Sequence, residues 1–317
     1  YDIGLGIPAE QLFRSFRLLL RFGRFSAAPQ SSAAFFADYL WQGSLLALTK
    51  QALSIPAEQP AVFASPVWLQ MGMHRMSMLG GSEIGISAAE AAELCEGLNQ
   101  FYADDGWRFQ VYRPDLWLLC LPETADWQAE PVLDVLGEVD GTMRAQGDGS
   151  RAWLSAQTEI QMWLHNHALN AARTAAGQPA INGVWLWRDL VGTQTNTPLL
   201  ASDSAWADAY PGARADAPYD YAAWCAIAAE QGADSGVIFL DDLLPAAHTA
   251  DVWAYQQTLQ AWDKRFFAPI WQDLRSGRLK QFTLATDGAE GGRLQLSAKA
   301  GRAFWKRQRV FQGKLGG

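Results

Sequence analysis

The stretch that most constrains the fold of this chain is 156–187, AQTEIQMWLHNHALNAARTAAGQPAINGVWLW. Its first part has helical period, and we expect one helix over about 153–175. The chain then runs into an apolar, Trp-rich strand over 183–187. A helix followed by such a strand is typical of an α/β fold.

The rest of the second half repeats this alternation. A polar, Pro-containing loop over 192–218 follows the Trp-rich strand. Helices are then expected over 219–231 and 250–276, and strands over 236–240, 281–285 and 293–297. Strands separated by helices of this length indicate βαβ units, so we predict a mainly parallel sheet for 151–317.

An N-terminal helical segment is expected over 1–61. Residues 10–25 carry an apolar face opposite a stripe of arginines. Such a helix can pack on its own domain with solvated arginines, or it can dock on a membrane surface or a partner. Packing is the simpler interpretation. A second helix over 34–53 is expected to be broken by Gly43.

An α+β module is predicted over 62–150. It opens with a strand over 62–71, and Ser87 followed by Glu90 forms a capping box that starts a helix. We expect that helix to bury one stripe of side chains, formed by Ala91, Leu94, Cys95, Leu98 and Phe101.

A hairpin completes this module. Strands over 107–112 and 116–121 are joined through Arg113-Pro114-Asp115, a plausible turn sequence. The Gly-rich stretch 138–150 is expected to be an exposed connection before the next domain.

Composition narrows the class of protein. Apolar residues make up 49% and charged residues 18%, which is typical of a folded globular chain. The 25 Lys and Arg against 33 Asp and Glu leave a net charge of −8, which disfavours general nucleic-acid binding. Nothing approaches the roughly 20 apolar residues of a transmembrane helix. The 3 cysteines indicate a reduced, cytoplasmic protein, and the 15 tryptophans should include several that line a groove or interface.

Three polar side chains of the helical stretch are candidates for a site. His167, Asn170 and Arg173 are spaced to lie along one helical stripe, and Asn182 follows just before the strand. An imidazole, an amide and a guanidinium together can hold a phosphate or a carboxylate. They can equally cap loops and bond to backbone carbonyls in a polar seam.

Other sources of chemistry are weaker. His165 would point roughly 160° away from His167 on a helix, so the two are poor joint ligands for a metal. The sequence has no GxSxG elbow, P-loop or GxGxxG motif. The basic stretch 299–309 is interleaved with aromatic residues, and on an acidic chain it is better interpreted as a solvated edge strand than as a nucleic-acid surface.

The segment HNHALNAARTAAGQPAINGVWLW resembles a stretch of the archaeal-type cofactor-independent phosphoglycerate mutases. Upstream, ISAAEAAELCEGLNQFYADDGWRFQVYRPDLWLLCL is similar to the inserted domain of that family. The similarity is closest to the bacterial RpfE-type regulatory proteins, which are relatives of those mutases. The matching positions are His167, Asn170, Arg173, Gly177, Pro179, Asn182, Trp185, Leu186 and Trp187.

The resemblance implies an alkaline-phosphatase-like fold, in which a Ser or Thr nucleophile works with two metal ions. Several of the residues that this chemistry requires are replaced here. In FLDDLLPAAHTAD, His248 and Asp251 fit the ligand pattern while Leu244 stands where an aspartate is expected. In ATDG, Asp287 fits, but Gly288 replaces a histidine. The nucleophile has no counterpart that the sequence reveals.

We therefore predict a truncated, alkaline-phosphatase-like sheet over 151–317, preceded by the mutase-like α+β module. The expected function is a non-catalytic, regulatory or ligand-binding role without a cofactor. A small phosphorylated ligand would bind in the groove beside His167, Asn170, Arg173 and Asn182, and a protein partner is the other expected kind of partner.

Two alternatives remain open. A diverged metal-dependent phosphotransferase or phosphohydrolase would bring His248, Asp251 and Asp287 together around one ion. A protein–protein interaction module would instead use Trp-rich surface and the Arg-striped helix as docking elements.

Overall fold

The computed structural model describes residues 13–71, 76–139, 145–301 and 315, which divide into two compact units. Unit 1 takes its residues from 1–41, 194–246 and 251–317, and unit 2 from 42–193 and 247–250. The domain boundaries predicted after residues 61 and 150 both fall inside unit 2. The reason is that segments distant in sequence pair there as neighbouring strands.

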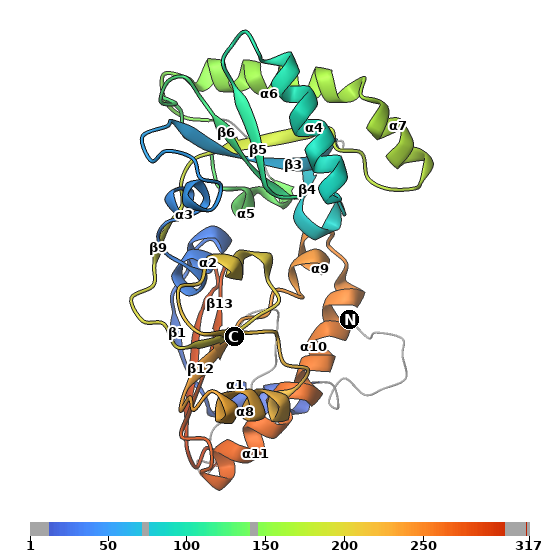
Figure 1. Cartoon of the computed structure of the whole chain (residues 1–317). Coiled ribbons are helices and arrows are strands. Elements are labelled where there is room, and N and C mark those ends of the chain that lie inside the picture. The colour runs from blue at the N-terminus through green and yellow to red at the C-terminus, as the bar shows by residue number, and fades with distance from the viewer. Residues whose placement is uncertain (1–12, 72–75, 140–144, 302–314, 316–317) are drawn as a thin grey trace. The chain divides into compact units, whose positions relative to one another are not determined.

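Unit 2 is built around one layer of strands, whose described pairs are antiparallel, with helices against it (Figure 1). Helix α4 packs against β5, and α6 packs against β8. Its elements are β2 (Gln42–Ser44), α3 (Leu45–Ala52), β3 (Ala61–Met71), β4 (Met76–Leu79), the 3₁₀ turn η1 (Gly81–Glu83), α4 (Ala88–Phe101), β5 (Arg108–Arg113), β6 (Leu116–Cys120), α5 (Val132–Val135), β7 (Gly137–Val139), α6 (Ser150–His165), α7 (Ala168–Ala175), β8 (Gly183–Trp187) and β9 (Val191–Thr193).

The long strand β3 organises this layer. It pairs with β6, β8 and β4, and the sheet runs in the order β5-β6-β3-β4-β7 with β8 also on β3. Every residue of β6 and β8 is buried, because both strands are apolar on both faces. The Phe63 and Trp187 rings stack across the β3–β8 pair with centroids 4.4 Å apart.

Unit 1 holds the remaining elements. Helix α9 (Leu244–His248) contributes residues to both units. The elements of unit 1 are α1 (Arg14–Phe22), β1 (Arg24–Ala27), α2 (Ser32–Leu40), β10 (Leu199–Ala201), η2 (Ala205–Ala209), β11 (Arg214–Ala215), α8 (Tyr221–Glu230), β12 (Gly236–Ile238), α10 (Val252–Trp262), the π-helical segment η3 (Asp263–Phe267), α11 (Ala268–Ser276), β13 (Gln281–Thr286) and β14 (Gly292–Ser297).

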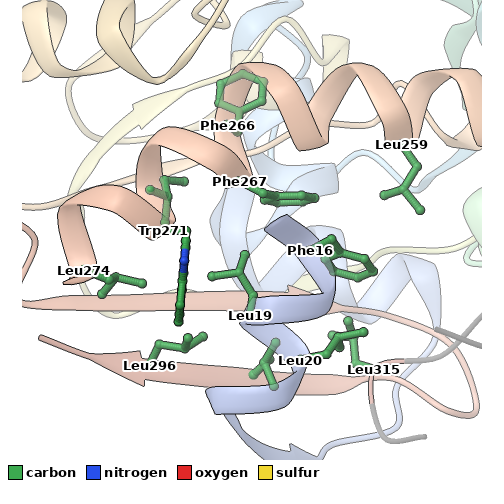
Figure 2. Close-up of a cluster of buried hydrophobic side chains, with 12 residues drawn as sticks. Phe16, Leu19, Leu20, Leu259, Phe266, Phe267, Trp271, Leu274, Leu296 and Leu315 are labelled. Carbon is green, nitrogen blue, oxygen red and sulfur yellow. The ribbon is translucent and has the colours of Figure 1, made fainter. Parts of the chain in front are cut away.

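A cluster of buried apolar side chains forms a core of unit 1 (Figure 2). In Figure 2, Phe16 and Leu19 of α1 point toward Phe267 and Trp271, and Leu296 of β14 lies beside them. The Phe16 and Phe267 rings stack with centroids 5.2 Å apart. The N-terminal amphipathic helix therefore packs on its own unit, as the simpler interpretation of its pattern indicates.

The mainly parallel sheet predicted for 151–317 is not confirmed, and the described pairing corrects it. Strand β8 pairs antiparallel with β3, and β13 pairs antiparallel with β14. Among the described strands, parallel pairing joins β10 to β11 and to β12. A run of apolar residues shows that a strand is buried, but it does not specify which partner the strand takes or in which direction.

Three of the predicted helices are interrupted, two of them unexpectedly. The helix expected over 153–175 is two helices, α6 and α7, separated at Asn166 and His167. The helix expected over 250–276 is continuous but has a π-helical segment just before Pro269, whose missing N–H removes one bond of the regular ladder. The helix expected over 34–53 breaks near Gly43, as predicted, with the short strand β2 at the break.

Several short-range predictions are confirmed. The strand at 61–71, the hairpin β5–β6 and the Ser87–Glu90 capping box are all present. The basic residues after Gly301, and part of the connection over 138–150, lie outside the described residues. No described helix is long and apolar enough to cross a membrane. All three cysteines are free; Cys95 and Cys120 are buried, and Cys225 is exposed.

Candidate functional site

The predicted site lies where α6 ends and α7 begins. His167 caps α7, because its Nδ1 accepts the Leu169 N–H at 3.2 Å. Its ring packs on Trp163, the centroids being 4.7 Å apart. With Nδ1 acting as an acceptor, the neutral imidazole carries its proton on Nε2 and presents a donor there.

Asn170 is buried, and its amide joins three backbone groups. Its Nδ2 donates to the carbonyl oxygens of Leu164 at 2.9 Å and Ile181 at 2.8 Å. Its Oδ1 accepts the Ile181 N–H at 2.8 Å. The side chain therefore ties the end of α6 to the segment that leads into β8.

Arg173 is 1% exposed, and each of its guanidinium nitrogens is bonded. Nε donates to the Pro179 carbonyl at 2.8 Å, Nη1 donates to Glu90 Oε1 at 2.8 Å, and Nη2 donates to the Ile84 carbonyl. Burial alone would raise the pKa of Glu90, but the Ser87 N–H and the Arg173 guanidinium outweigh it and lower that pKa. This ion pair fastens α7 to the start of α4.

Asn182 extends the pairing of β8 with β3. Its Oδ1 accepts the Leu69 N–H at 2.6 Å, and its Nδ2 donates to the Leu69 carbonyl at 2.8 Å. The amide thus takes the place of one more backbone pair in the ladder.

The structure separates the residues of the predicted stripe. The polar groups of Asn170, Arg173 and Asn182 bond to backbone groups and hold neighbouring segments together. This is the structural alternative that the sequence left open. His167 differs because it also lines a surface pocket. The four residues therefore do not form one shared ligand site in this structure.

The pocket lies between α4 and the end of α6 and has a volume of about 440 Å³. Its wall is mostly apolar, and Phe101 is 49% and Met162 66% exposed. Gly97 of α4 allows the Trp163 ring to pack close, because a Cβ at Gly97 would lie 2.6 Å from that ring. The lining residues are Phe101, Glu159, Met162, Trp163, Asn166 and His167.

Glu159 gives this pocket its negative charge. Its carboxylate accepts hydrogen bonds from the Tyr102 hydroxyl at 3.3 Å and the Ser155 hydroxyl at 3.0 Å. Burial, together with the neighbouring Glu159 carboxylate, raises the pKa of Tyr102. The pocket therefore combines aromatic and thioether surface with a fixed carboxylate and an imidazole donor.

Sequence reasoning placed Phe101 in a buried stripe, and this was wrong. The residue ends α4, and its ring is half exposed, because the buried stripe continues from Leu98 to Tyr102, which is 3% exposed and stacks on Trp107. The sequence does contain one sign of this pocket, because Met162 is an apolar side chain on an otherwise polar face of α6. A large exposed apolar group beside a charged one marks a surface that differs from ordinary solvated helix.

The three residues that match metal ligands of the mutases have other roles here. His248 Nδ1 lies 2.7 Å from Glu83 Oε1, and both side chains are close to buried. Asp251 caps α10 by accepting the Ala254 N–H at 2.9 Å. Asp287 accepts a hydrogen bond from the Ser32 hydroxyl at the start of α2. His248 belongs to unit 2, whereas Asp251 and Asp287 belong to unit 1.

A two-metal centre does not fit these residues. Within the described parts of the chain, no three His, Cys, Asp or Glu side chains are grouped so that they could hold a metal ion. Two metals in one site each need several oxygen or nitrogen ligands. His248 contacts Glu83, Asp251 caps a helix, and Asp287 bonds to Ser32.

No protein-family model matches this chain, and no curated protein matches it. Two solved structures are similar in fold. A cofactor-independent phosphoglycerate mutase from Thermoplasma acidophilum has 11% identity and a TM-score of 0.35, with 93% of this chain and 87% of that chain covered. The PH0037 protein from Pyrococcus horikoshii has 10% identity and a TM-score of 0.42, with 94% and 83% covered. At identities this low, neither likeness assigns a role to a residue here.

Proposed function

We propose that this chain is a cytoplasmic, non-catalytic ligand-binding protein, of the RpfE type and on a mutase-related scaffold, that acts through the pocket between α4 and α6. The observation that carries the proposal is the pocket itself. It sets the Glu159 carboxylate and the His167 imidazole among the exposed Phe101 and Met162 side chains. Concave, largely apolar surface with a few convergent polar groups is typical of a ligand site.

The chemistry of the wall favours a cation with an apolar body. An ammonium or guanidinium group can approach the Glu159 carboxylate while its apolar part lies against the rings of Phe101 and Trp163. The ligand could be a free organic amine or the basic side chain of a peptide, because both present the same group.

A phosphorylated ligand fits this pocket less well. The Arg173 guanidinium, the group best suited to a phosphate, is buried and already bonded to Glu90 and two carbonyls. The pocket instead presents the Glu159 carboxylate, which would repel a phosphate. We therefore replace the phosphorylated metabolite suggested by the sequence with a cationic ligand.

Ligand-observed NMR and calorimetry would test this proposal. We expect 2-phenylethylammonium to bind, 3-phosphoglycerate not to bind, and Glu159→Gln to weaken the amine about fivefold to tenfold, or roughly 1 kcal/mol. Glu93→Gln is the matched control, because Glu93 is an exposed carboxylate of α4 outside the pocket lining. A tripeptide with a central arginine distinguishes a peptide ligand from a free amine. Amine binding that is unchanged in Glu159→Gln would refute the pocket assignment.

A diverged phosphotransferase is the second candidate, and one observation favours it. The Ser32 hydroxyl and the Asp287 carboxylate meet at the start of α2, where helix N–H groups can receive an anion. Phosphorus NMR of 3-phosphoglycerate incubated with the protein and Mn²⁺ tests it. Turnover that disappears in Asp287→Asn would support this candidate over the binding protein, and no turnover would remove it.

A further inference from the structure

The histidine that caps α7 also forms part of the wall of the α4–α6 pocket. His167 occupies the N-cap position, and its Nδ1 accepts the Leu169 N–H at 3.2 Å. The ring is partly exposed, packs on Trp163 and lines the pocket together with Glu159. One imidazole therefore holds the start of a helix and borders the ligand site at the same time.

The cap requires a neutral ring. A protonated imidazole carries a hydrogen on both nitrogens, so Nδ1 of His167 could no longer accept the Leu169 N–H. The unpaired N–H groups at a helix start also give that end a partial positive charge, which disfavours a cation there. Protonation of His167 thus removes the hydrogen bond that begins α7 and places two like charges together.

A bound cation gives a second reason for a neutral ring. An ammonium group that approaches the Glu159 carboxylate lies in the same pocket as the His167 imidazole. Two positive charges in a largely apolar pocket repel each other more strongly than in water, because such surroundings screen them less. A proton on His167 and a cationic ligand therefore oppose each other.

The elements packed around the ring carry other titratable side chains, but among the described residues none of these lines the pocket with Glu159 and His167. Those that are exposed and outside the lining are Glu93, Glu96 and His165. Those that are buried are Cys95, Tyr102 and Arg173, the last paired with Glu90. Burial raises the pKa of this thiol and of this phenol, so both stay neutral. The charge of the pocket wall is therefore decided by Glu159 and His167.

We propose that His167 makes ligand binding at this pocket dependent on pH, so that the neutral ring admits the cation and the protonated ring releases it. This regulation presupposes the proposed cationic ligand. Histidine is the side chain that ordinarily changes charge between about pH 5 and 8. A bound cation favours the neutral ring, and by the same coupling the neutral ring favours the bound cation. The affinity is therefore highest above this pH range and falls as the pH decreases through it.

Calorimetric titration of the full chain with 2-phenylethylammonium at about pH 8 and about pH 5.5, at constant ionic strength, tests this regulation. The ligand keeps its charge at both pH values, because an alkyl ammonium such as that of lysine loses its proton only near about pH 10. We expect the affinity of the wild type to be about tenfold lower at the acidic pH, as repulsion between two charges in one pocket predicts.

His167→Asn separates this effect from protonation of Glu159. An asparagine amide also caps a helix start through its oxygen, but its charge does not change with pH. The affinity of this variant should differ by less than about twofold between the two pH values. His165→Asn is the matched control, because His165 is an exposed histidine of α6 outside the lining, and it should keep the wild-type dependence. Thermal unfolding at both pH values shows whether each protein is folded.

The outcomes distinguish the regulation from the ligand itself. If the amine does not bind at the higher pH, the proposed ligand is wrong and the regulation falls with it. Equal affinity of the wild type at both pH values would overturn the regulation alone and leave the cationic ligand in place. A loss of the same size in His167→Asn would also overturn it, because another group would then be the one that titrates.

Discussion

The two ends of helix α7 show how differently one sequence motif can be used. At its start, His167 is partly exposed, packs on Trp163 and lines an open pocket. Two turns later, Arg173 is buried, and each of its guanidinium nitrogens is bonded to another part of unit 2. Residues that look like one polar stripe therefore divide into a binding end and a structural end. We therefore expect substitutions near Arg173 to lower the stability of the fold, and substitutions near His167 to weaken ligand binding.

The largest effect is expected for Arg173→Met. The change leaves the Ile84 and Pro179 carbonyls and the Glu90 carboxylate without their donor. We expect a loss of about 3–5 kcal/mol in the free energy of unfolding, measured by urea denaturation. Arg151→Met is the control, because Arg151 is exposed on α6. A loss equal to that of the control would contradict the structural role of Arg173.

Asn170→Ala should have the next largest effect. It removes three hydrogen bonds to backbone groups of Leu164 and Ile181, and Asn170 itself is buried. We expect a loss of about 2–4 kcal/mol, because the backbone groups left behind stay buried. Amine binding to the folded variant should change by less than twofold. If binding falls while stability is unaffected, the two ends of α7 are not divided as proposed.

Glu90→Gln should cost about 1–2 kcal/mol at neutral pH, because a neutral amide replaces the carboxylate partner of Arg173. The pKa of Glu90 is lowered in the folded state, so its stabilising contribution is complete above the unfolded value of 4.5. That contribution is lost as the pH falls through the lower folded-state pKa. Urea denaturation of both proteins between pH 7 and acidic pH should show that the difference in their free energies of unfolding becomes smaller. A difference that grows on acidification would contradict this prediction.

Met162→Ser is expected to have the smallest effect on stability, within about 0.5 kcal/mol, because the side chain is 66% exposed. It should nevertheless weaken 2-phenylethylammonium severalfold, since the pocket loses apolar surface. Calorimetric titration measures this change, and Leu154→Ser, at an exposed position on α6 outside the pocket lining, provides the comparison. Equal affinity in the two variants would exclude Met162 from the binding surface.

Much of the local structure could be predicted from the residues alone. The capping box at Ser87 and Glu90 and the turn between β5 and β6 depend on residues a few positions apart, and both are present. The break between α6 and α7 was missed. At the break His167 caps α7, and the Asn170 amide bonds to Ile181, 11 positions later; helical periodicity does not reveal a contact of that range.

The candidate site was predicted only in part. His167 was identified by its residue type and spacing, and it does line a pocket. Glu159 lies within the same informative stretch, but its partner across the pocket, Phe101, was assigned to a core. Phe101 and Tyr102 are both aromatic and adjacent, and only the packing of α4 on β5 decides that Tyr102 is the one that is buried.

The sequence by itself determined local features such as the capping box that starts α4, the β5–β6 hairpin and the buried strands β6 and β8, because capping, turn residues and apolar content act within a few residues. Only the tertiary structure decided how those segments are used. The partner of Arg173 lies 83 positions away and that of Asn182 lies 113 positions away. The antiparallel direction of β8 on β3 is set by the same long-range packing. Polar groups must find partners when they are buried, and the packing of distant segments settles which partner each one finds.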